Sequence, residues 1–540
     1  MFKKKNYLFL LFIFNNIFSS CLILNDDQVK TLCLPMSDAY PMRYMYHKQY
    51  FENELQDKDY WIVKPDFFYR YERSFNGNKI GALLFKSNPI VATYDSNVSP
   101  YLSSINSAIG MEDSNSNSST YVNGIINNNF FTMSMTFMKG NSNWYFNFGI
   151  PVQRANYTLN LNETVNTNGL VTKGYFGVEY SRTDVPSSEY EKIPSNNYPA
   201  LKSLTNYLSG CLTGDMVERI YSTVKPNCGI STWGLADIYC QLGYDFCKSC
   251  NGQYGFYGRV VIPTSASLSN IWAENIFSPI IGNIGRLELD FGFNGHYFLW
   301  DCDNQYLKVV LDGYVGYIGS SSGHRTFDLY NGPMTRYSSV KVFNYNNNYD
   351  EFLIWGADLT TQCLSVYAPL KSEIVLDCIY KFCNQTCNIG YSFKAQAAER
   401  TCCNLNMNKD YYYGLASRCN VQTPYIDNNN LLWTNNMVTP KSSMYETNSL
   451  DITSINSNGI FNVNGILMSD EYAISSNDIN INSGLMNMQM LNILFLGYKY
   501  ISECIGWNPE FGISASIGFS PIKYYTPELW DLNFSINLNY

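Results

Sequence analysis

Apolar and polar side chains alternate strictly along several short stretches of this chain. In the last ten residues, DLNFSINLNY, one parity is wholly apolar: Leu532, Phe534, Ile536, Leu538 and Tyr540. Because successive side chains of a β-strand point to opposite faces, this segment is predicted to be a strand with one apolar and one polar face. At about 3.3 Å per residue and a tilt near 45°, such a strand rises about 23 Å, which matches the apolar belt of a membrane-spanning strand.

This final strand resembles the terminal strand of bacterial outer-membrane β-barrels, in which the alternation ends on a C-terminal aromatic residue that the assembly machinery recognises. The resemblance implies a C-terminal assembly signal formed by Phe534, Ile536, Leu538 and Tyr540. It also implies outer-membrane lipid, the barrel-assembly machinery and periplasmic chaperones as partners. The alternative is a half-exposed terminal strand of a soluble β-sandwich.

The same alternation recurs inside the chain and predicts further strands. The clearest are 131–137, 144–152, 236–246, 256–263, 286–294, 307–318, 491–500 and 511–519, with weaker periodicity at 156–162, 169–180 and 449–468. At roughly 30 residues per strand with its connection, the chain is expected to hold about 16 strands, within a range of 12–18. The predicted fold is all-β: a single large antiparallel transmembrane β-barrel with long loops.

Local signals predict the remaining elements. Asn76-Gly77 between β-rich runs predicts a hairpin that joins 61–75 to 79–85. The Ser- and Asn-rich stretch 94–129 predicts a long surface loop. Apolar residues at helical spacing in 199–211 predict one short amphipathic helix, packed against the barrel end or folded into the lumen.

The N-terminus carries the features of an export signal. Three lysines, an apolar run over 7–18 and the pair Ser19-Ser20 predict a secretory signal peptide in residues 1–20. Cys21 stands where a lipoprotein would be acylated, with ordinary cleavage as the alternative. Residues 21–58 are expected to form an N-terminal extension and 59–540 the barrel. The predicted location is therefore the bacterial outer membrane.

Composition changes this picture only in part. The formal net charge is −9 and the chain has no basic stripe, which disfavours a nucleic-acid partner. The 45 Tyr and 9 Trp suit a membrane interface, although a Tyr-rich soluble β-protein would show the same excess. Whether copies associate into a homo-oligomer is left open.

Sixteen cysteines are unusual for a bacterial barrel. Export to an oxidising compartment predicts disulfides, with a Cys-rich loop region at about 363–419. Cys247 and Cys250 have the spacing of a zinc half-site. The chain has no second CxxC motif, no histidine near this pair and only three histidines, so no metal site is predicted.

Catalytic motifs are weak. Gly319–Gly323 has the letters of a nucleophile elbow, with Ser321 as the nucleophile and His324 nearby, but no helix is predicted after it. There is no HExxH motif and no phosphate-binding loop, so neither enzymatic activity nor a cofactor is predicted, and a barrel-embedded lipase is kept as an alternative.

The polar parity of the predicted strands supplies lumen-lining candidates: Asp237, Arg286, Glu288, Asp290 and Asp312. Such charges would bias the passage of cations or polar solutes, or would simply be hydrated. The predicted function is a porin-like channel for small polar solutes or a structural surface protein. A secreted, disulfide-stapled β-sandwich or adhesin is the alternative.

Overall fold

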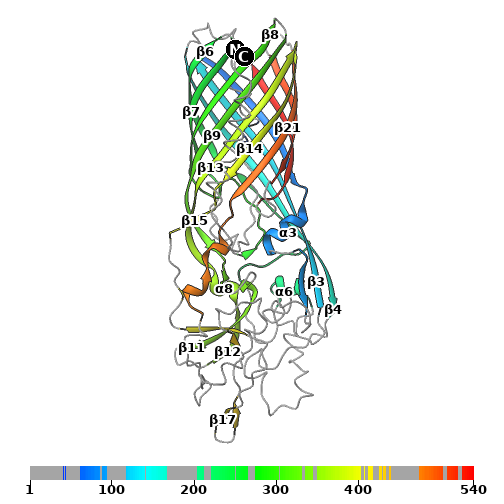
Figure 1. Ribbon diagram of the computed structural model, residues 1–540, viewed down its shortest axis with the longest axis vertical. Helices are drawn as coiled ribbons and strands as arrows, with labels where there is room; N and C mark the ends of the chain where they lie inside the picture. The colour runs from blue at the N-terminus through cyan, green and yellow to red at the C-terminus, as the bar shows by residue number, and fades with distance from the viewer. Residues whose placement is uncertain are drawn as a thin grey trace, which may run out of the picture.

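The structure is a computed structural model, and its described elements form an upright cylinder of long strands with smaller strands and short helices below it (Figure 1). It describes residues 41, 43, 61–85, 88–93, 117–139, 142–166, 203–211, 220–249, 251–265, 274–302, 305–330, 335–344, 349–402, 407, 411–416, 425–427, 430–432, 437–438, 474–502, 508–520 and 526–539. The predicted signal peptide, most of the predicted extension 21–58 and the predicted strands 169–180 and 449–468 lie outside the described residues.

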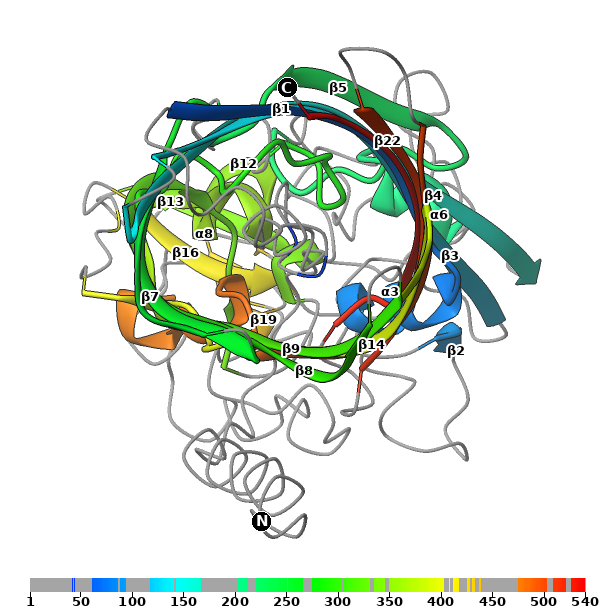
Figure 2. The ribbon, with the colours of Figure 1, turned by 90° about the horizontal axis from the view of Figure 1, so that it is seen from above.

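Twelve strands form a closed antiparallel ring, which Figure 2 shows end-on. They are β1 (Trp61–Ser74), β3 (Asn117–Lys139), β4 (Trp144–Asn166), β6 (Ile238–Ser249), β7 (Gly252–Ile262), β8 (Glu288–Cys302), β9 (Gln305–Arg325), β13 (Gln362–Phe382), β14 (Gln385–Gln396), β21 (Gln489–Ile501), β22 (Asn508–Phe519) and β23 (Leu529–Asn539). Each pairs with the next along the chain, and β1 pairs with β23 to close the ring. The closed ring confirms the predicted barrel and excludes the predicted alternative of a sandwich of two stacked sheets.

The prediction of about 16 strands is wrong, and 12 is the lower limit of the predicted range. The strands are longer than the prediction assumed, because β3 and β4 each have 23 residues and β9 and β13 each have 21. The predicted strands 144–152 and 156–162 are two parts of the single strand β4. Long connections take up the rest of the chain.

The two ends of the barrel differ. At one end short turns join β3 to β4, β6 to β7, β8 to β9, β13 to β14 and β21 to β22. At the other end lie the long connections, among them 167–237 and 397–488. We call these the short-turn end and the long-connection end. In transmembrane barrels of bacteria, short turns face the periplasm and long loops face the outside.

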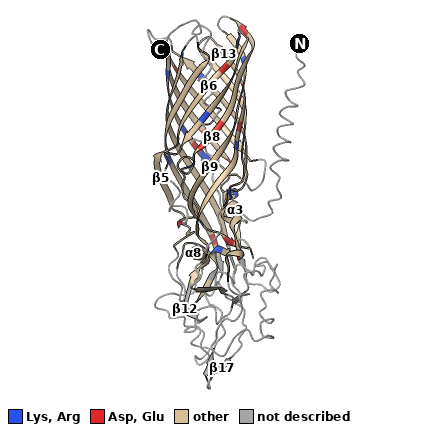
Figure 3. Cartoon of the chain, turned by 90° about the vertical axis from the view of Figure 1, so that its left-hand side faces the viewer, with Lys and Arg blue, Asp and Glu red and all other residues tan. Residues whose placement is uncertain are grey.

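Side chains of the barrel strands alternate between its two faces. On β23, Asp531, Asn533, Ser535 and Asn537 point inward and are 3–7% exposed, whereas Phe534 and Ile536 point outward and are 46% and 43% exposed. On β8, Phe291 is 66% exposed and its neighbour Asp290 is 6% exposed. The outer surface is therefore apolar and the interior polar. Figure 3 shows acidic and basic positions along the height of the barrel strands.

The segment after Asn76 is a helix and not the predicted hairpin. Gly77–Phe85 forms α3 because Ile80, Leu83 and Leu84 recur at helical spacing, which outweighs the Asn-Gly turn signal. Strand β3 also begins at Asn117, inside the predicted loop 94–129. Its Val122 and Ile126 are fully buried on the side that packs against α3, which explains why a Ser- and Asn-rich sequence is ordered there.

The predicted Cys-rich loop region 363–419 is largely barrel wall, because β13 and β14 together span Gln362 to Gln396. In β13 the alternation is weakened by apolar residues on the inner face, where Val375 and Ile379 are buried. None of the ten described cysteines forms a disulfide. The expected disulfide framework is thus not supported within the described part of the chain.

Smaller elements lie at the long-connection end (Figure 1). Strands β2 (Ile90–Thr93) and β5 (Gly229–Leu235) extend the sheet beside β3 and β4, and a separate four-stranded sheet has the order β12-β11-β16-β19. Those four strands are β11 (Ser339–Asn344), β12 (Tyr349–Trp355), β16 (Tyr411–Ala416) and β19 (Met437–Val438). The other small strands are β10 (Asp328–Leu329), β15 (Arg400–Thr401), β17 (Tyr425–Asp427), β18 (Asn430–Leu432) and β20 (Ile479–Asn480).

Short helices complete this end of the molecule: α6 (Leu204–Leu208), α8 (Gly356–Thr360) and the 3-10 turns η4 (Thr335–Tyr337), η6 (Ser476–Asp478) and η7 (Ile481–Gly484). The described part of the predicted helix 199–211 contains α6, which packs on the barrel extension formed by β3 and β4. No helix in the described ranges has the length and apolar character needed to cross a membrane.

Candidate functional site

The candidate functional site is the interior of the barrel together with the mouth at its long-connection end. All five lumen-lining candidates from the sequence are buried there: Asp237, Arg286, Glu288, Asp290 and Asp312 are 0–6% exposed. Glu288, Asp290 and Asp312 lie on adjacent strands β8 and β9. Asp237 and Arg286 precede β6 and β8 at the long-connection end.

A network of paired charges fills one side of the interior. The Arg259 guanidinium on β7 lies 2.6 Å from Asp290 and 3.7 Å from Glu288. Lys371 on β13 lies 2.9 Å from the other oxygen of Glu288, so Glu288 joins two cations. Further along the same wall, Lys394 on β14 is 3.6 Å from Glu373. The wall from β7 to β14 is therefore cross-linked through its interior side chains.

Tyrosines pack among these charges. Tyr145, Tyr239, Tyr257 and Tyr314 point inward and are 0–4% exposed. The Arg259 guanidinium stands 4.2 Å from the ring centre of Tyr314, and the Tyr145 hydroxyl accepts a hydrogen bond of 2.8 Å from Asn294. These rings fill the space between the walls, and sequence alternation alone did not single them out, because tyrosine suits either face of a strand.

Asp312 differs from the other lumen carboxylates. One oxygen accepts a hydrogen bond of 3.2 Å from the Tyr257 hydroxyl. The other oxygen, fully buried, has no hydrogen-bond partner among the described residues. Asp290 also has one oxygen without a hydrogen-bond partner, but it is paired with Arg259, whereas Asp312 forms no ion pair with a described residue. A buried carboxylate that lacks both is costly in free energy.

A residue that precedes the first strand also lies inside the barrel. The Arg43 guanidinium forms a buried ion pair with Asp531 on β23, and both side chains are less than 5% exposed. A cavity of about 20 Å³ beside it is lined by Arg43, Phe68, Asn388, Lys499 and other residues of β14 and β21–β23. That volume holds about one water molecule, so this part of the lumen is nearly filled.

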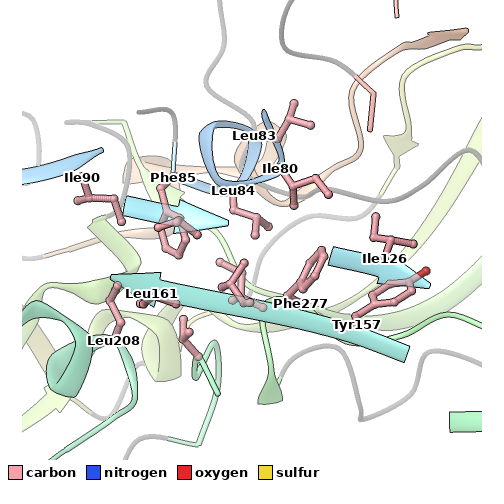
Figure 4. Packing of buried hydrophobic residues seen from close by; sticks show 14 of the residues in the cluster. Ile80, Leu83, Leu84, Phe85, Ile90, Ile126, Tyr157, Leu161, Leu208 and Phe277 are labelled. Atoms are coloured by element: carbon pink, nitrogen blue, oxygen red, sulfur yellow. The ribbon is translucent and has the colours of Figure 1, made fainter. Parts of the chain in front are cut away.

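The mouth at the long-connection end is spanned by a hydrophobic cluster, which we call the cap (Figure 4). Its core joins α3, α6, the inward faces of β3 and β4, the segment 276–284, Tyr337, Trp355 and Met486. Tyr207 of α6 stacks edge-on against Trp355 with ring centres 4.8 Å apart, and its hydroxyl donates to the Tyr337 carbonyl. Phe85 of α3 also contacts Tyr337, at 6.4 Å between ring centres.

Tyr337 and Trp355 belong to the connection between β9 and β13, whereas Phe85 follows β1. In the ring order, β13 lies six strands from β3, on the opposite wall. The cap therefore connects elements from opposite sides of the barrel mouth.

A charge cluster lies between the cap and the charged wall. Glu399, between β14 and β15, accepts from the Arg286 guanidinium, from Arg325 at 3.4 Å and from the backbone N–H of Met486 at 2.9 Å. Burial opposes ionisation of Glu399, but Arg286 and Arg325 outweigh it and lower its pKa to about 2. At the same end, burial raises the pKa of Asp237, which accepts hydrogen bonds from Ser265.

The Ser–His pair of the lipase alternative does not form a nucleophile and base. Ser321 lies within β9, where its hydroxyl accepts from Arg286 at 3.4 Å. Residues three apart in a strand point to opposite faces, and the His324 ring stacks on Tyr221. No strand–turn–helix elbow surrounds Ser321, since the strand continues to Arg325. The prediction that the chain is not an enzyme stays a prediction.

The described residues contain no cluster of three or more potential metal ligands. Of the predicted assembly signal, Phe534 and Ile536 lie on the outer face and Leu538 is half-buried, while Tyr540 lies outside the described residues. The signal's role in assembly stays a prediction.

A closed antiparallel ring with an apolar outer face and a charged, polar interior defines the class: this is a β-barrel of the outer-membrane type. No family model matches the chain, and no curated protein matches its sequence.

Solved structures that the chain resembles include an outer membrane channel from Pseudomonas putida, at 6% identity, covering 91% of this chain and 100% of that one with a TM-score of 0.35. A second is a Pseudomonas aeruginosa FadL homologue, at 7% identity, covering 90% of this chain and 91% of that one with a TM-score of 0.26. A third is the translocator domain of the autotransporter NalP from Neisseria meningitidis, at 6% identity, covering 90% of this chain and 91% of that one with a TM-score of 0.27. Because each TM-score is below 0.5, the class rests on the barrel's own geometry.

Proposed function

We propose that this chain is an outer-membrane β-barrel channel that is closed at rest and passes small polar solutes only when its lumen is vacated. The observation that carries the proposal is Arg43, which lies inside a charged, polar interior and is paired there with Asp531. A lumen lined largely by charged and polar side chains suits the passage of water-soluble molecules once space exists.

The described interior leaves little space for solutes in this state. Inward side chains from all sides are nearly fully buried, the cavity beside Arg43 is about 20 Å³, and the cap spans the mouth. An open porin lumen would instead expose its lining to water. The resting conductance is therefore expected to be close to zero.

A variant that lacks residues 21–58 but keeps the predicted signal peptide 1–20 tests this proposal. In planar bilayers the full chain should give rare or no channel openings, and the deletion variant should conduct. The substitution Arg43→Gln should raise the fraction of time spent open, whereas Arg400→Gln, which changes an exposed arginine outside the ring, should not. Free conduction by the full chain would contradict closure at rest.

The second candidate function is a structural surface protein, and the cap favours it. A mouth sealed by packed aromatic residues would serve a barrel that anchors an external assembly and never opens. Conductance distinguishes the two candidates, because a purely structural barrel should remain silent even without residues 21–58.

A further inference from the structure

Two arginines stand apart from every other basic residue of the ring. Arg73 on β1 and Arg154 on β4 are exposed on the outer face, and they are the only exposed Lys or Arg within the described positions of the twelve strands. The basic residues Arg70, Arg259 and Lys371 are buried in the interior. A charge on the lipid-facing surface is costly at mid-membrane, so the heights of these two arginines matter.

Arg154 lies at the edge of the apolar belt. Outward residues of β4 run from Trp144, 54% exposed, to Val152, 39% exposed, and Arg154 is the next outward position. At about 2.5 Å of height per residue in a tilted strand, the distance from Trp144 to Val152 covers about 20 Å, and Arg154 lies about 5 Å beyond. This is where the hydrocarbon ends and lipid headgroups begin.

Arg73 lies at a similar height. One row of paired residues runs from Glu288, at the long-connection end of β8, to Glu510, near the short-turn end of β22. The strands are tilted, so a row of paired residues does not stay at one height. Each step of the row, from β4 to β3 and from β3 to β1, lies about 3 Å nearer the short-turn end.

The row of Arg73 passes through Asn127 to Asn156 on β4, two residues beyond Arg154. Asn156 is two residues farther than Arg154 from the short-turn end, and the two steps of the row bring Arg73 back toward that end by about the same height. Arg73 and Arg154 therefore lie at one height, two strands or about 10 Å apart.

The surroundings of the two arginines are those of a membrane interface. Trp233 on β5, the register partner of Arg154, is 78% exposed. Asn127 lies between the two arginines and accepts a hydrogen bond of 3.4 Å from the Tyr71 hydroxyl. Arg154 donates to Ser231 at 3.5 Å, and no other described residue bonds to its guanidinium. We call Arg73, Asn127, Arg154 and Trp233 the outer arginine patch.

We propose that the outer arginine patch binds the phosphate-bearing headgroup of an anionic lipid in the leaflet on the long-connection side. Guanidinium groups hold phosphate oxygens through paired hydrogen bonds, and an amphipathic indole suits the headgroup boundary. The patch continues the apolar belt, so a lipid whose chains lie on Val152 and Phe131 places its headgroup at the arginines. The exposed acid of the ring, Asp301, lies at the opposite, short-turn end.

This inference rests on the proposed membrane location and is tested with the full chain inserted in phosphatidylcholine vesicles. Tryptophan quenching is measured with a small fraction of brominated phosphatidylglycerol and, separately, with the same fraction of brominated phosphatidylcholine. The part of the signal lost in Trp233→Phe belongs to the patch. Each arginine near an anionic headgroup should contribute about a fivefold preference, so the wild-type patch should favour the anionic lipid severalfold.

Arg73→Gln together with Arg154→Gln should abolish that preference, while Asp301→Asn, which alters an exposed charge at the other rim, should leave it unchanged. Equal quenching of Trp233 by both lipids in the wild type would overturn the inference. So would loss of the preference in millimolar inorganic phosphate at constant ionic strength, because the site would then be one for free phosphate. Absence of quenching by either lipid would instead mean that the barrel had not inserted, which counts against the membrane location itself.

Discussion

At the scale of single residues, the interior of the barrel is governed by whether each buried charge has a partner. Asp290 is paired with Arg259 at 2.6 Å, whereas Asp312 accepts hydrogen bonds from Tyr257 and from the backbone of Gly313 and forms no ion pair with a described residue. Removing one member of a buried ion pair leaves the other charge uncompensated, but removing an unpaired charge relieves a cost. Two isosteric substitutions on adjacent strands should therefore have different effects.

Asp290→Asn is expected to lower the free energy of unfolding by about 3 kcal/mol, because Arg259 loses its closest partner. Asp312→Asn should change it by less than about 1 kcal/mol or raise it, because the amide can still accept from Tyr257. The temperature at which the purified barrel loses its folded migration on a denaturing gel gives the order of the two variants. Equal losses in both would show that Asp312 has a partner that the described residues do not include.

Glu399 gives a pH dependence at the same scale. Its pKa is about 2 in the folded chain, below the usual value of 4.5, because Arg286 and Arg325 outweigh its burial. A lowered carboxyl pKa contributes stability above the unfolded-state value, and this contribution is lost as pH falls from about 4.5 toward 2.

Glu399→Gln should remove this part of the pH dependence and cost about 3 kcal/mol at neutral pH, where two buried arginines lose their partner. Urea unfolding of both forms between pH 2 and pH 7 measures it, and parallel curves would contradict the assignment.

At the scale of elements, close packing of helix α3 on β3 fixes one side of the cap. A Cβ atom added at Gly81 of α3 would lie 2.5 Å from the backbone oxygen of Val122 on β3. No heavy atom lies within 4 Å of the corresponding position at Gly258 on β7. Replacing glycine by alanine therefore creates a steric clash at Gly81 and none at Gly258.

Gly81→Ala should push α3 away from β3 and cost about 2 kcal/mol, because backbone atoms cannot yield as a flexible side chain does. Gly258→Ala should be tolerated within about 0.5 kcal/mol, since its methyl group would face outward. Protease cleavage of the long connections at native pH measures loosening of the cap, and equal cleavage rates in the two variants would contradict the packing described.

The elements also show what the sequence could predict. Alternation located β6, β7, β22 and β23 within about four residues, because their outward positions are strongly apolar and their inward positions polar. It found the start of β8 but ended that strand at 294, whereas β8 continues to Cys302. It failed on α3, where turn chemistry masked a helical spacing, and on the start of β3, where polar residues pair with β4 outside the apolar belt. Periodicity reports which face a residue takes and not where a strand ends, so it overestimated the number of strands.

For the candidate site, the sequence predicted five buried polar positions but not their partners. Asp237, Arg286, Glu288, Asp290 and Asp312 all face inward or toward the mouth. Arg259, Lys371 and Glu399 complete the interior network, and they lie 29 to 113 residues from their partners along the chain. Arg43 gave no signal at all, because it precedes the first strand in a stretch without periodicity.

At the scale of the whole molecule, the protein is a barrel with an apolar outer surface and an interior packed with inward side chains. Closure through β1 and β23 removes the sheet edges, and the long connections are gathered at one end. The predicted outer-membrane location agrees with this architecture. Outward residues of a barrel strand should contact lipid and inward residues should lie in a packed interior without open water. Because side chains alternate along a strand, labels on one strand can test both.

A spin label carried by an unnatural amino acid, placed in turn at each position from Leu532 to Asn537 of β23, gives the most direct test in vesicles. The account predicts that oxygen, which dissolves in lipid, reaches labels at 532, 534 and 536, and that a polar nickel complex reaches none of the six positions. Access of the nickel complex to 533, 535 and 537 would reveal an open aqueous lumen. Its access to 534 and 536 would show that no lipid surrounds the barrel, and either result would contradict the account.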